Sequence, residues 1–324
     1  MATHSPIFLD PALDEEFATK GYFVIPLLTP EDIAALYELR SVTGRAIPSD
    51  YYATVLDPDL EYRRVINDGV ERIMSPRVLP LLNGYRCCSN AFIDKRGNTS
   101  MGRVPLHQDY TFVDQSRHTG VHVWVPLVDV NEENGCLSAF PGTHSFVNHV
   151  SVIPTGPSPW DSVRGLLEAE CGIRVPMKAG SAFVYNERLL HSSDENRTAS
   201  ERPAAAGAFI PQDARMRLYV KREGTAGTVD VMEMDHFLDV LTEYQKFKVV
   251  NADRVAQIAT EEHVITPLTA DQIECLRINR PPRPQAAAPA AVPEAAPAPV
   301  PAAAEQVQPA APPKRSWFRR LFGV

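Results

Sequence analysis

The sequence predicts a mainly β protein whose core is a jelly roll of two sheets, with helices added at both ends. Three observations indicate this class. Short apolar segments with a period of two recur between residues 85 and 210, turn residues separate them, and helical spacing is found near the N-terminus. Many short strands at such spacing are typical of a two-sheet barrel or sandwich.

The first predicted elements are a strand and a helix. The apolar run at 21–28, GYFVIPLL, is expected to form a short strand that leads into the helix. Thr29 can cap a helix and Pro30 suits its first position. Two acidic residues and then apolar residues at helical spacing follow at 31–40, as in the first turns of an amphipathic helix.

The β core is predicted from segments rich in β-branched and aromatic residues. Turn signals stand between them at Asn134-Gly135 and at Pro141-Gly142-Thr143. Further helices are expected around 232–278. The predicted strands are 85–94, 104–110, 121–128, 136–140, 181–186 and 205–210.

The composition divides the chain near residue 281. The chain is 44% hydrophobic and 22% charged, which suits a globular domain, expected at 1–280. Residues 281–313 are almost entirely alanine and proline and predict a disordered, extended linker. The basic, aromatic tail at 314–324 suits an anionic membrane surface or a partner protein, with a functionless end as the alternative.

Charge and cysteine content limit the function classes. The net charge of -8 and the absence of a basic cluster in the main body argue against a nucleic-acid partner. Five cysteines without repeating spacing favour a reducing compartment. Neither a secretory signal nor a membrane-spanning apolar run is found. We expect a cytoplasmic protein, with peripheral membrane contact through the tail left open.

His107 and Asp109 are candidate metal ligands. One residue separates them, so on a strand both side chains project from the same face. His191, at the end of the apolar run 181–191, is the candidate third ligand. Two histidines and one carboxylate leave three coordination positions open, as in non-haem iron(II) oxygenases. A single H-x-D is common by chance, so the assignment of a metal site depends on the other motifs in the chain.

Several other histidines could be ligands in principle but are left out of the predicted metal site. Histidines are most often hydrogen-bonded surface or core residues, and none of these has a carboxylate two positions away. They are His118, His122, His144 and His149.

Three motifs in the chain resemble the phytanoyl-CoA dioxygenase family of iron(II)/2-oxoglutarate-dependent oxygenases. They are the H-x-D at 107–109, the block W-x-x-L-x-D-x-x-x-x-N-G-x-L-x-x-x-P-G-[ST]-H at 124–144, and H-x-S-x-x-N-x-[ST]-x-x-x-R at 191–202. They occur in order and at family-like spacing, and the resemblance covers roughly residues 15–220. It implies a double-stranded β-helix, the cupin-like form of a jelly roll.

The resemblance also implies roles for single residues. His107, Asp109 and His191 are similar to the family's iron ligands. Arg202 is similar to its anchor for the far carboxylate of 2-oxoglutarate, and Ser193 to a serine that shares this carboxylate. A guanidinium suits the task because it binds a carboxylate through two parallel hydrogen bonds.

Two further positions are implied at the cosubstrate pocket. Trp124 is similar to a tryptophan that lines it, and Lys95 lies in the strand before the H-x-D. The alternatives are that Trp124 is ordinary core and that Arg202 pairs with Glu201 or another surface acid. The Pro- and Gly-rich insert at 151–176 is expected to be irregular and to lie over the substrate.

The implied activity is that of an iron(II)- and 2-oxoglutarate-dependent dioxygenase, a hydroxylase of aliphatic carbon. Dioxygen and a small-molecule, acyl or natural-product substrate are its implied partners. Related halogenases replace the carboxylate ligand by a small residue, so the presence of Asp109 favours hydroxylation or desaturation. Two alternatives remain: a non-catalytic metal- or ligand-binding jelly roll, and a scaffold tethered to a partner through the tail.

Overall fold

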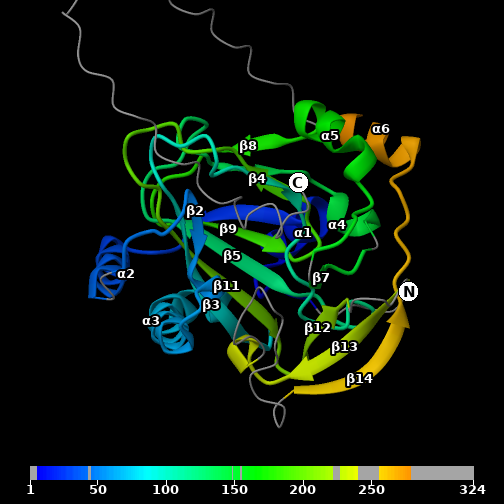
Figure 1. Ribbon diagram of the computed structural model, residues 1–324, viewed down its shortest axis with the longest axis horizontal. Helices are drawn as coiled ribbons and strands as arrows, with labels where there is room; N and C mark the ends of the chain where they lie inside the picture. The colour runs from blue at the N-terminus through cyan, green and yellow to red at the C-terminus, as the bar shows by residue number, and fades with distance from the viewer. Residues whose placement is uncertain are drawn as a thin grey trace, which may run out of the picture.

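Two facing sheets form the centre of the molecule in this computed structural model (Figure 1). The larger sheet has the strand order β1-β9-β5-β11-β3-β2, and the smaller sheet has the order β4-β10-β6-β8. The strands are β1 (Tyr22–Pro26), β2 (Tyr51–Ala53), β3 (Tyr85–Lys95), β4 (Val104–His107), β5 (Val121–Pro126), β6 (Leu137–Ala139), β8 (Ile173–Val175), β9 (Ser181–Asn186), β10 (His191–Ser193) and β11 (Ala204–Pro211).

The structure describes most of the predicted oxygenase domain. The linker predicted at 281–313 and the tail at 314–324 lie outside the described residues. The described ranges are 6–42, 45–147, 149–153, 155–221, 227–239 and 255–278.

The chain winds between the two sheets. It passes from β3 in the larger sheet to β4 in the smaller one, and then to β5 and β6 in the same alternation. After β8 it alternates again through β9, β10 and β11. This winding of antiparallel strands into two sheets is a double-stranded β-helix, so the predicted fold class is confirmed.

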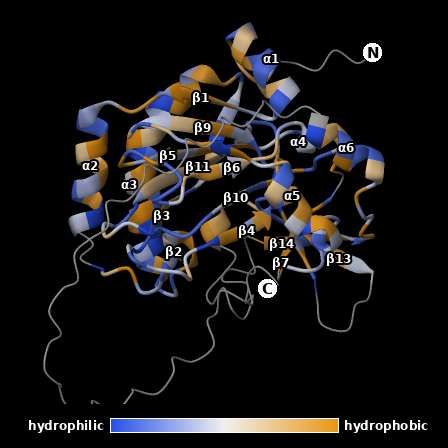
Figure 2. Cartoon of the chain, turned by 90° about the horizontal axis from the view of Figure 1, so that it is seen from above, coloured by the Kyte–Doolittle hydropathy of each residue, from blue (hydrophilic) through white to orange (hydrophobic). Residues whose placement is uncertain are grey.

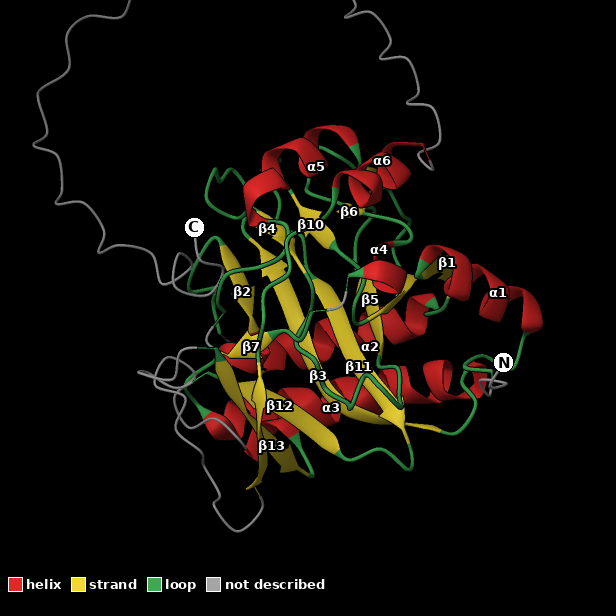
Figure 3. Cartoon of the chain, turned by 90° about the vertical axis from the view of Figure 1, so that its right-hand side faces the viewer, coloured by secondary structure: helices red, strands yellow, loops and turns green. Residues whose placement is uncertain are grey.

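Three helices, α1 (Pro11–Lys20), α2 (Pro30–Val42) and α3 (Leu60–Val78), are added outside the larger sheet (Figures 1 and 3). α3 packs on β3 and β11, α2 packs on α3, and α1 contacts β1. The residues that α3 contributes to the buried hydrophobic core recur every fourth position, from Ile66 through Val70 and Met74 to Val78. One apolar stripe of the helix therefore covers the sheet. Figure 2 shows apolar residues interspersed with hydrophilic ones in the strands of the larger sheet.

The predicted start of α2 is confirmed by its capping contacts. The backbone N–H of Asp32 donates to Thr29 Oγ1 over 3.2 Å, and the backbone N–H of Thr29 donates to Asp32 Oδ2 over 2.9 Å. The two residues therefore satisfy each other's backbone donors, as in a capping box. The preceding strand β1 confirms the prediction for the run GYFVIPLL.

A third sheet corrects the prediction of helices around 232–278. The described part of that range contains the end of one strand, a complete second strand, the short turn η4 (Phe237–Asp239) and helix α6 (Ala270–Ile278). Sequence periodicity missed these strands because pairing between residues far apart in the chain outweighs weak local preference. The strands of the sheet are β7 (Val152–Ile153), β12 (Met216–Val220), β13 (Thr228–Met234) and β14 (Val255–Glu262), in the order β14-β13-β12-β7.

The insert at 151–176 is also more regular than predicted. It contains β7, the turn η3 (Asp161–Val163), helix α5 (Arg164–Glu170) and β8, which pairs with β6. Leu167 of α5 is buried in an apolar cluster with Trp160, so packing rather than local pattern orders this segment. Within the described ranges, none of the helices is both long enough and apolar enough to cross a bilayer.

Candidate active site

β4 and β10 bring the two candidate histidine ligands together. They are antiparallel neighbours, and His107 pairs with His191 in their register. Directly paired residues on antiparallel strands project to the same face, and the two imidazole rings are 4.2 Å apart between centroids. Asp109 lies two residues beyond the end of β4, so the predicted strand at 104–110 was too long. The β4–β10 pairing reaches no further than His107 and His191, which leaves Asp109 on a loop.

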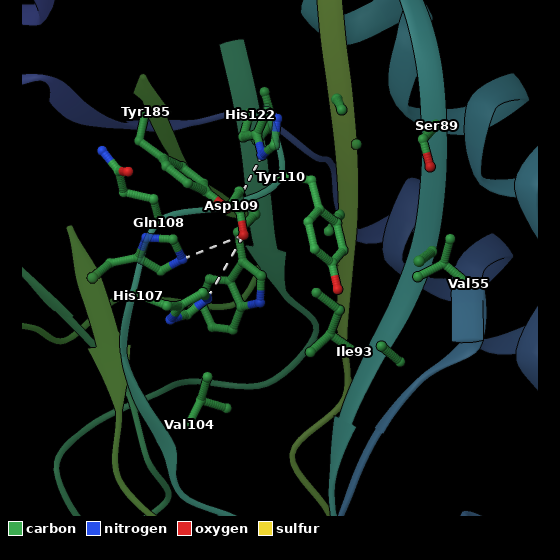
Figure 4. Close-up of a pocket in the computed structure, with 18 of the residues that line it drawn as sticks. Val55, Ser89, Ile93, Val104, His107, Gln108, Asp109, Tyr110, His122 and Tyr185 are labelled. Atoms are coloured by element: carbon green, nitrogen blue, oxygen red, sulfur yellow. Dashed lines mark hydrogen bonds and ion pairs between the residues drawn. The ribbon is translucent and has the colours of Figure 1, made fainter. Parts of the chain in front are cut away.

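Asp109 completes a group that could hold a metal ion. One ligand atom from each of His107, Asp109 and His191 lies within 4.8 Å of the others. Asp109 Oδ1 is 3.7 Å from the Nε2 atom of each histidine (Figure 4). These separations are too long for hydrogen bonds and leave room for a cation between the three atoms.

The outer nitrogens of both imidazoles contact backbone carbonyls. His107 Nδ1 lies 2.9 Å from the carbonyl oxygen of Pro105, and His191 Nδ1 lies 3.0 Å from that of Leu189. If each Nδ1 carries the proton, each Nε2 presents its lone pair toward Asp109. Hydrogen bonds of this kind set the tautomer and orientation of metal-binding histidines.

The electrostatics of the three residues also suit a cation. Burial, and then the neighbouring His191, lower the pKa of His107 to about 3. Burial alone would raise the pKa of Asp109, but the imidazoles of His122, His191 and His107 hold it well below its usual value. Near neutral pH, His107 is therefore neutral and Asp109 ionised, the protonation states required of metal ligands.

The group lies in a cavity of about 200 Å³ between the two sheets. On the larger sheet, side chains two residues apart face this cavity because strand residues alternate between faces. Small residues at several of these positions leave space beside the candidate metal ligands. The positions are Ser89, Ala91 and Ile93 of β3, His122 and Trp124 of β5, Tyr185 of β9, and Ala206 and Ala208 of β11.

Arg202 also lines this cavity, as a buried cation whose guanidinium is only partly hydrogen-bonded by the described residues. Its side chain is 2% exposed, and Nε and Nη1 have no hydrogen-bond partner among the described residues. Burial lowers its pKa to about 10, so it remains charged at neutral pH. The predicted alternative of pairing with Glu201 is wrong, since Glu201 instead binds Arg40 over 2.7 Å. Leaving guanidinium N–H groups buried and unpaired is costly, so this site suits an anionic ligand.

Trp124 and Ser193 line the same cavity as Arg202. The Arg202 guanidinium carbon lies 5.1 Å from the centroid of the Trp124 ring. Trp124 also packs in a buried apolar cluster, so the cavity and core interpretations of this residue both apply.

Lys95 is fully buried and contacts Ser193. Its Nζ donates to Ser193 Oγ over 2.7 Å and also to the carbonyl oxygen of Asp194. Burial, followed by the charge of Arg202, lowers the pKa of Lys95 well below its usual value. Lys95 is not among the residues that line the cavity. Lys95 therefore lies behind Ser193. The sequence motifs alone did not distinguish this position from one in direct contact with the cosubstrate.

Two residues at this site were missed by the sequence analysis. His122 Nδ1 lies 2.6 Å from Asp109 Oδ2, and the Tyr185 hydroxyl donates to the same oxygen over 2.5 Å. His122 was left out because it has no nearby carboxylate in sequence. A signal was present, because His122 stands two residues before Trp124 on one strand and must share its face.

Fold and site together define a double-stranded β-helix protein with two histidines and an aspartate arranged to hold a cation. Residues 22–204, more than half of the chain, match the family Phytanoyl-CoA dioxygenase (PhyH). The chain belongs to this family, which confirms the resemblance seen in its motifs.

Individual relatives match over shorter regions. Phytanoyl-CoA dioxygenase of Arabidopsis thaliana is 31% identical over 118 residues, 35% of this chain and 40% of that protein. The peroxisomal phytanoyl-CoA dioxygenase of Homo sapiens is 26% identical over 133 residues, 38% of this chain and 37% of that protein. L-proline trans-4-hydroxylase of Streptomyces griseoviridis is 29% identical over 125 residues, 30% of this chain and 44% of that protein. The chain thus spans less than half the length of these relatives.

Solved structures are similar at lower identity. The epimerase SnoN, in complex with Fe3+, alpha ketoglutarate and nogalamycin RO, is 20% identical with a TM-score of 0.49, covering 81% of this chain and 98% of that one. HygX from Streptomyces hygroscopicus, with nickel and 2-oxoglutarate bound, is 18% identical with a TM-score of 0.45, covering 63% of this chain and 88% of that one.

Proposed function

We propose that this chain is an iron(II)- and 2-oxoglutarate-dependent dioxygenase that hydroxylates an aliphatic carbon of a small-molecule, acyl or natural-product substrate. One observation carries the proposal: a group able to hold a cation faces the same cavity as a buried guanidinium, two nitrogens of which have no hydrogen-bond partner among the described residues. A metal ion would bind to the first group, and a carboxylate of a dicarboxylate would pair with the guanidinium. Membership of the Phytanoyl-CoA dioxygenase family supports the assignment.

His107, Asp109 and His191 are the proposed iron ligands. Iron(II) in such a site supplies the activation of dioxygen, while the protein fixes the reacting groups and shields them from water. A metal held by only these three residues would have coordination positions available for 2-oxoglutarate and dioxygen. The carboxylate of Asp109 favours hydroxylation or desaturation over halogenation.

Arg202 is the proposed anchor for the far carboxylate of 2-oxoglutarate. Its unpaired Nε and Nη1 can donate to a carboxylate, which supports this role. Ser193 would donate its hydroxyl proton to the same carboxylate, because Lys95 already donates to the Ser193 oxygen. Lys95 would thus act through Ser193, and Trp124 would flank the cosubstrate.

The chemistry of the cavity wall supports an uncharged, largely aliphatic reacting group. The side chains of the wall that are charged or carry an imidazole are His107, Asp109, His122, His191 and Arg202. Each of them is a proposed metal ligand or cosubstrate anchor, or contacts Asp109. The remainder is uncharged and mostly apolar, with Val55, Ile93, Phe112 and Ala208 among its members. An ionised group placed against this wall would lose its hydration without gaining a counter-charge.

We predict that Ser89→Phe blocks the substrate while sparing the cosubstrate. Six strand residues, or about 20 Å, separate Ser89 from Lys95 along β3, so a bulky ring at Ser89 is far from Ser193. Succinate release that depends on substrate should fall at least roughly tenfold, whereas 2-oxoglutarate affinity should not change. Ser89→Ala keeps the space open and is the matched control. Full turnover by Ser89→Phe would show that the substrate does not reach this end.

A metabolite screen that follows succinate release tests the proposed function. Purified protein with iron(II) and 2-oxoglutarate should consume oxygen and release succinate when its substrate is supplied. Calorimetry of 2-oxoglutarate binding to the metal-loaded protein tests the site without the substrate. Absence of metal-dependent 2-oxoglutarate binding would contradict the proposal and favour a non-catalytic ligand-binding jelly roll.

The domain boundary near residue 280 is also a proposal. Deletion of 281–324 should leave iron binding and turnover intact, because no proposed ligand or anchor residue lies there. We propose a cytoplasmic protein whose tail contacts an anionic membrane or a partner, so deletion should reduce sedimentation with anionic vesicles or co-purification of that partner. Lost turnover would overturn the boundary. Unchanged vesicle and partner binding would argue against the tail's role and against a tethered scaffold.

A further inference from the structure

Asp109 receives two side-chain hydrogen bonds, and both reach the same carboxylate oxygen. Oδ2 lies 2.6 Å from His122 Nδ1 and 2.5 Å from the Tyr185 hydroxyl. An ionised carboxylate carries no proton, so His122 and Tyr185 must be the donors. A carboxylate oxygen offers about two acceptor sites, so both sites of Oδ2 are occupied.

The two donors come as a pair from the larger sheet. His122 on β5 and Tyr185 on β9 are directly opposite in the antiparallel register, with ring centroids 5.5 Å apart. His107 and His191 belong to the smaller sheet on the other side of the cavity. Asp109 is therefore held from one sheet while its second oxygen faces the histidines of the other (Figure 4).

The environment of His122 agrees with this donor assignment. With the proton on Nδ1, its Nε2 carries a lone pair, and Nε2 is buried without a hydrogen-bond partner among the described residues. The Phe112 ring lies beside the imidazole, with centroids 5.6 Å apart. Because Nε2 carries no proton in this tautomer, the His122 ring has no buried N–H donor without an acceptor.

We propose that His122 and Tyr185 are positioning residues that keep Asp109 a monodentate metal ligand. Their hydrogen bonds hold Oδ2 away from the cation and leave Oδ1, 3.7 Å from each histidine Nε2, to bind it. A bidentate carboxylate would occupy one of the positions that 2-oxoglutarate and dioxygen need. This inference rests on the proposed function, but it assigns roles to two residues outside the family motifs quoted above.

Cobalt(II) is a suitable probe because it binds such sites and its visible spectrum reports coordination. Tyr185→Phe and His122→Leu each remove one donor with little change of volume. Each should weaken cobalt(II) binding roughly ten- to a hundredfold and alter the cobalt spectrum, as is typical when a partner of a metal ligand is lost. At saturating cobalt(II), 2-oxoglutarate should also bind more weakly, because the released Oδ2 competes for its position.

His122→Asn retains an N–H donor on a short side chain and should recover part of the lost affinity. Tyr37→Phe is the matched control, since the Tyr37 hydroxyl donates to the Leu127 carbonyl over 3.3 Å and Tyr37 does not line the cavity. It should leave cobalt(II) binding unchanged. Thermal unfolding of the metal-free variants separates local effects from loss of fold.

The outcomes distinguish this inference from the proposed function. Wild-type affinity and spectrum in folded Tyr185→Phe and His122→Leu would overturn the positioning role alone. A wild-type protein that binds neither cobalt(II) nor 2-oxoglutarate would overturn the proposed function itself.

Discussion

Replacing His107, Asp109 or His191 with alanine is expected to abolish iron(II) binding without unfolding the protein. Each side chain supplies one of three atoms that lie within 4.8 Å of one another, and a methyl group cannot replace any of them. The residues border an existing cavity, so shortening them enlarges it without removing apolar core. Iron content after anaerobic loading and thermal unfolding of the metal-free protein measure the two effects.

His144→Ala is the matched control for this series. His144 is buried like His191, but its Nε2 contacts the carbonyl oxygen of Ala18 over 3.1 Å, and it does not line the cavity. This variant should bind iron(II) normally even if its stability falls. Full iron occupancy in any two of the three ligand variants would contradict the assignment.

Arg202→Lys is expected to weaken 2-oxoglutarate binding by about ten- to a hundredfold while iron(II) affinity stays near normal. Lysine keeps the charge but loses the planar pair of donors. Losing one charge-assisted hydrogen bond costs about 1.5–3 kcal/mol, which corresponds to that range of affinity. Calorimetric titration of the metal-loaded protein with 2-oxoglutarate provides the measurement.

Arg217→Lys is the matched control for replacing an arginine with a lysine. Arg217 lies in the third sheet, where it pairs with Glu233 and Asp114 over 3.1 Å, and it should tolerate lysine without a change in 2-oxoglutarate binding. An unchanged affinity in Arg202→Lys would indicate that another donor binds the far carboxylate. Ser193, which shares the cavity wall, would then be the next residue to replace.

Patterns within single segments predicted much of the core. The strand predicted at 181–186 is β9 itself, and the helix predicted to begin at Thr29-Pro30 begins there. The signals for these two elements are local, because the alternating buried residues and the capping side chains lie within a few positions of one another. The prediction failed for β14, of which only Val255 is buried, so no alternation of apolar residues marks this strand in the sequence.

The sequence by itself determined the order and spacing of the H-x-D, the distal histidine and Arg202, and these identified the family before any contact was known. Only the tertiary structure decided how Asp109 is held. Its hydrogen bonds come from His122 and Tyr185, 13 and 76 positions away along the chain. Tertiary structure likewise decided that Nε and Nη1 of Arg202 have no hydrogen-bond partner among the described residues and that Lys95 lies behind Ser193. Such contacts depend on which strands become neighbours, and strand pairing is set by burial across the whole chain rather than by any local pattern.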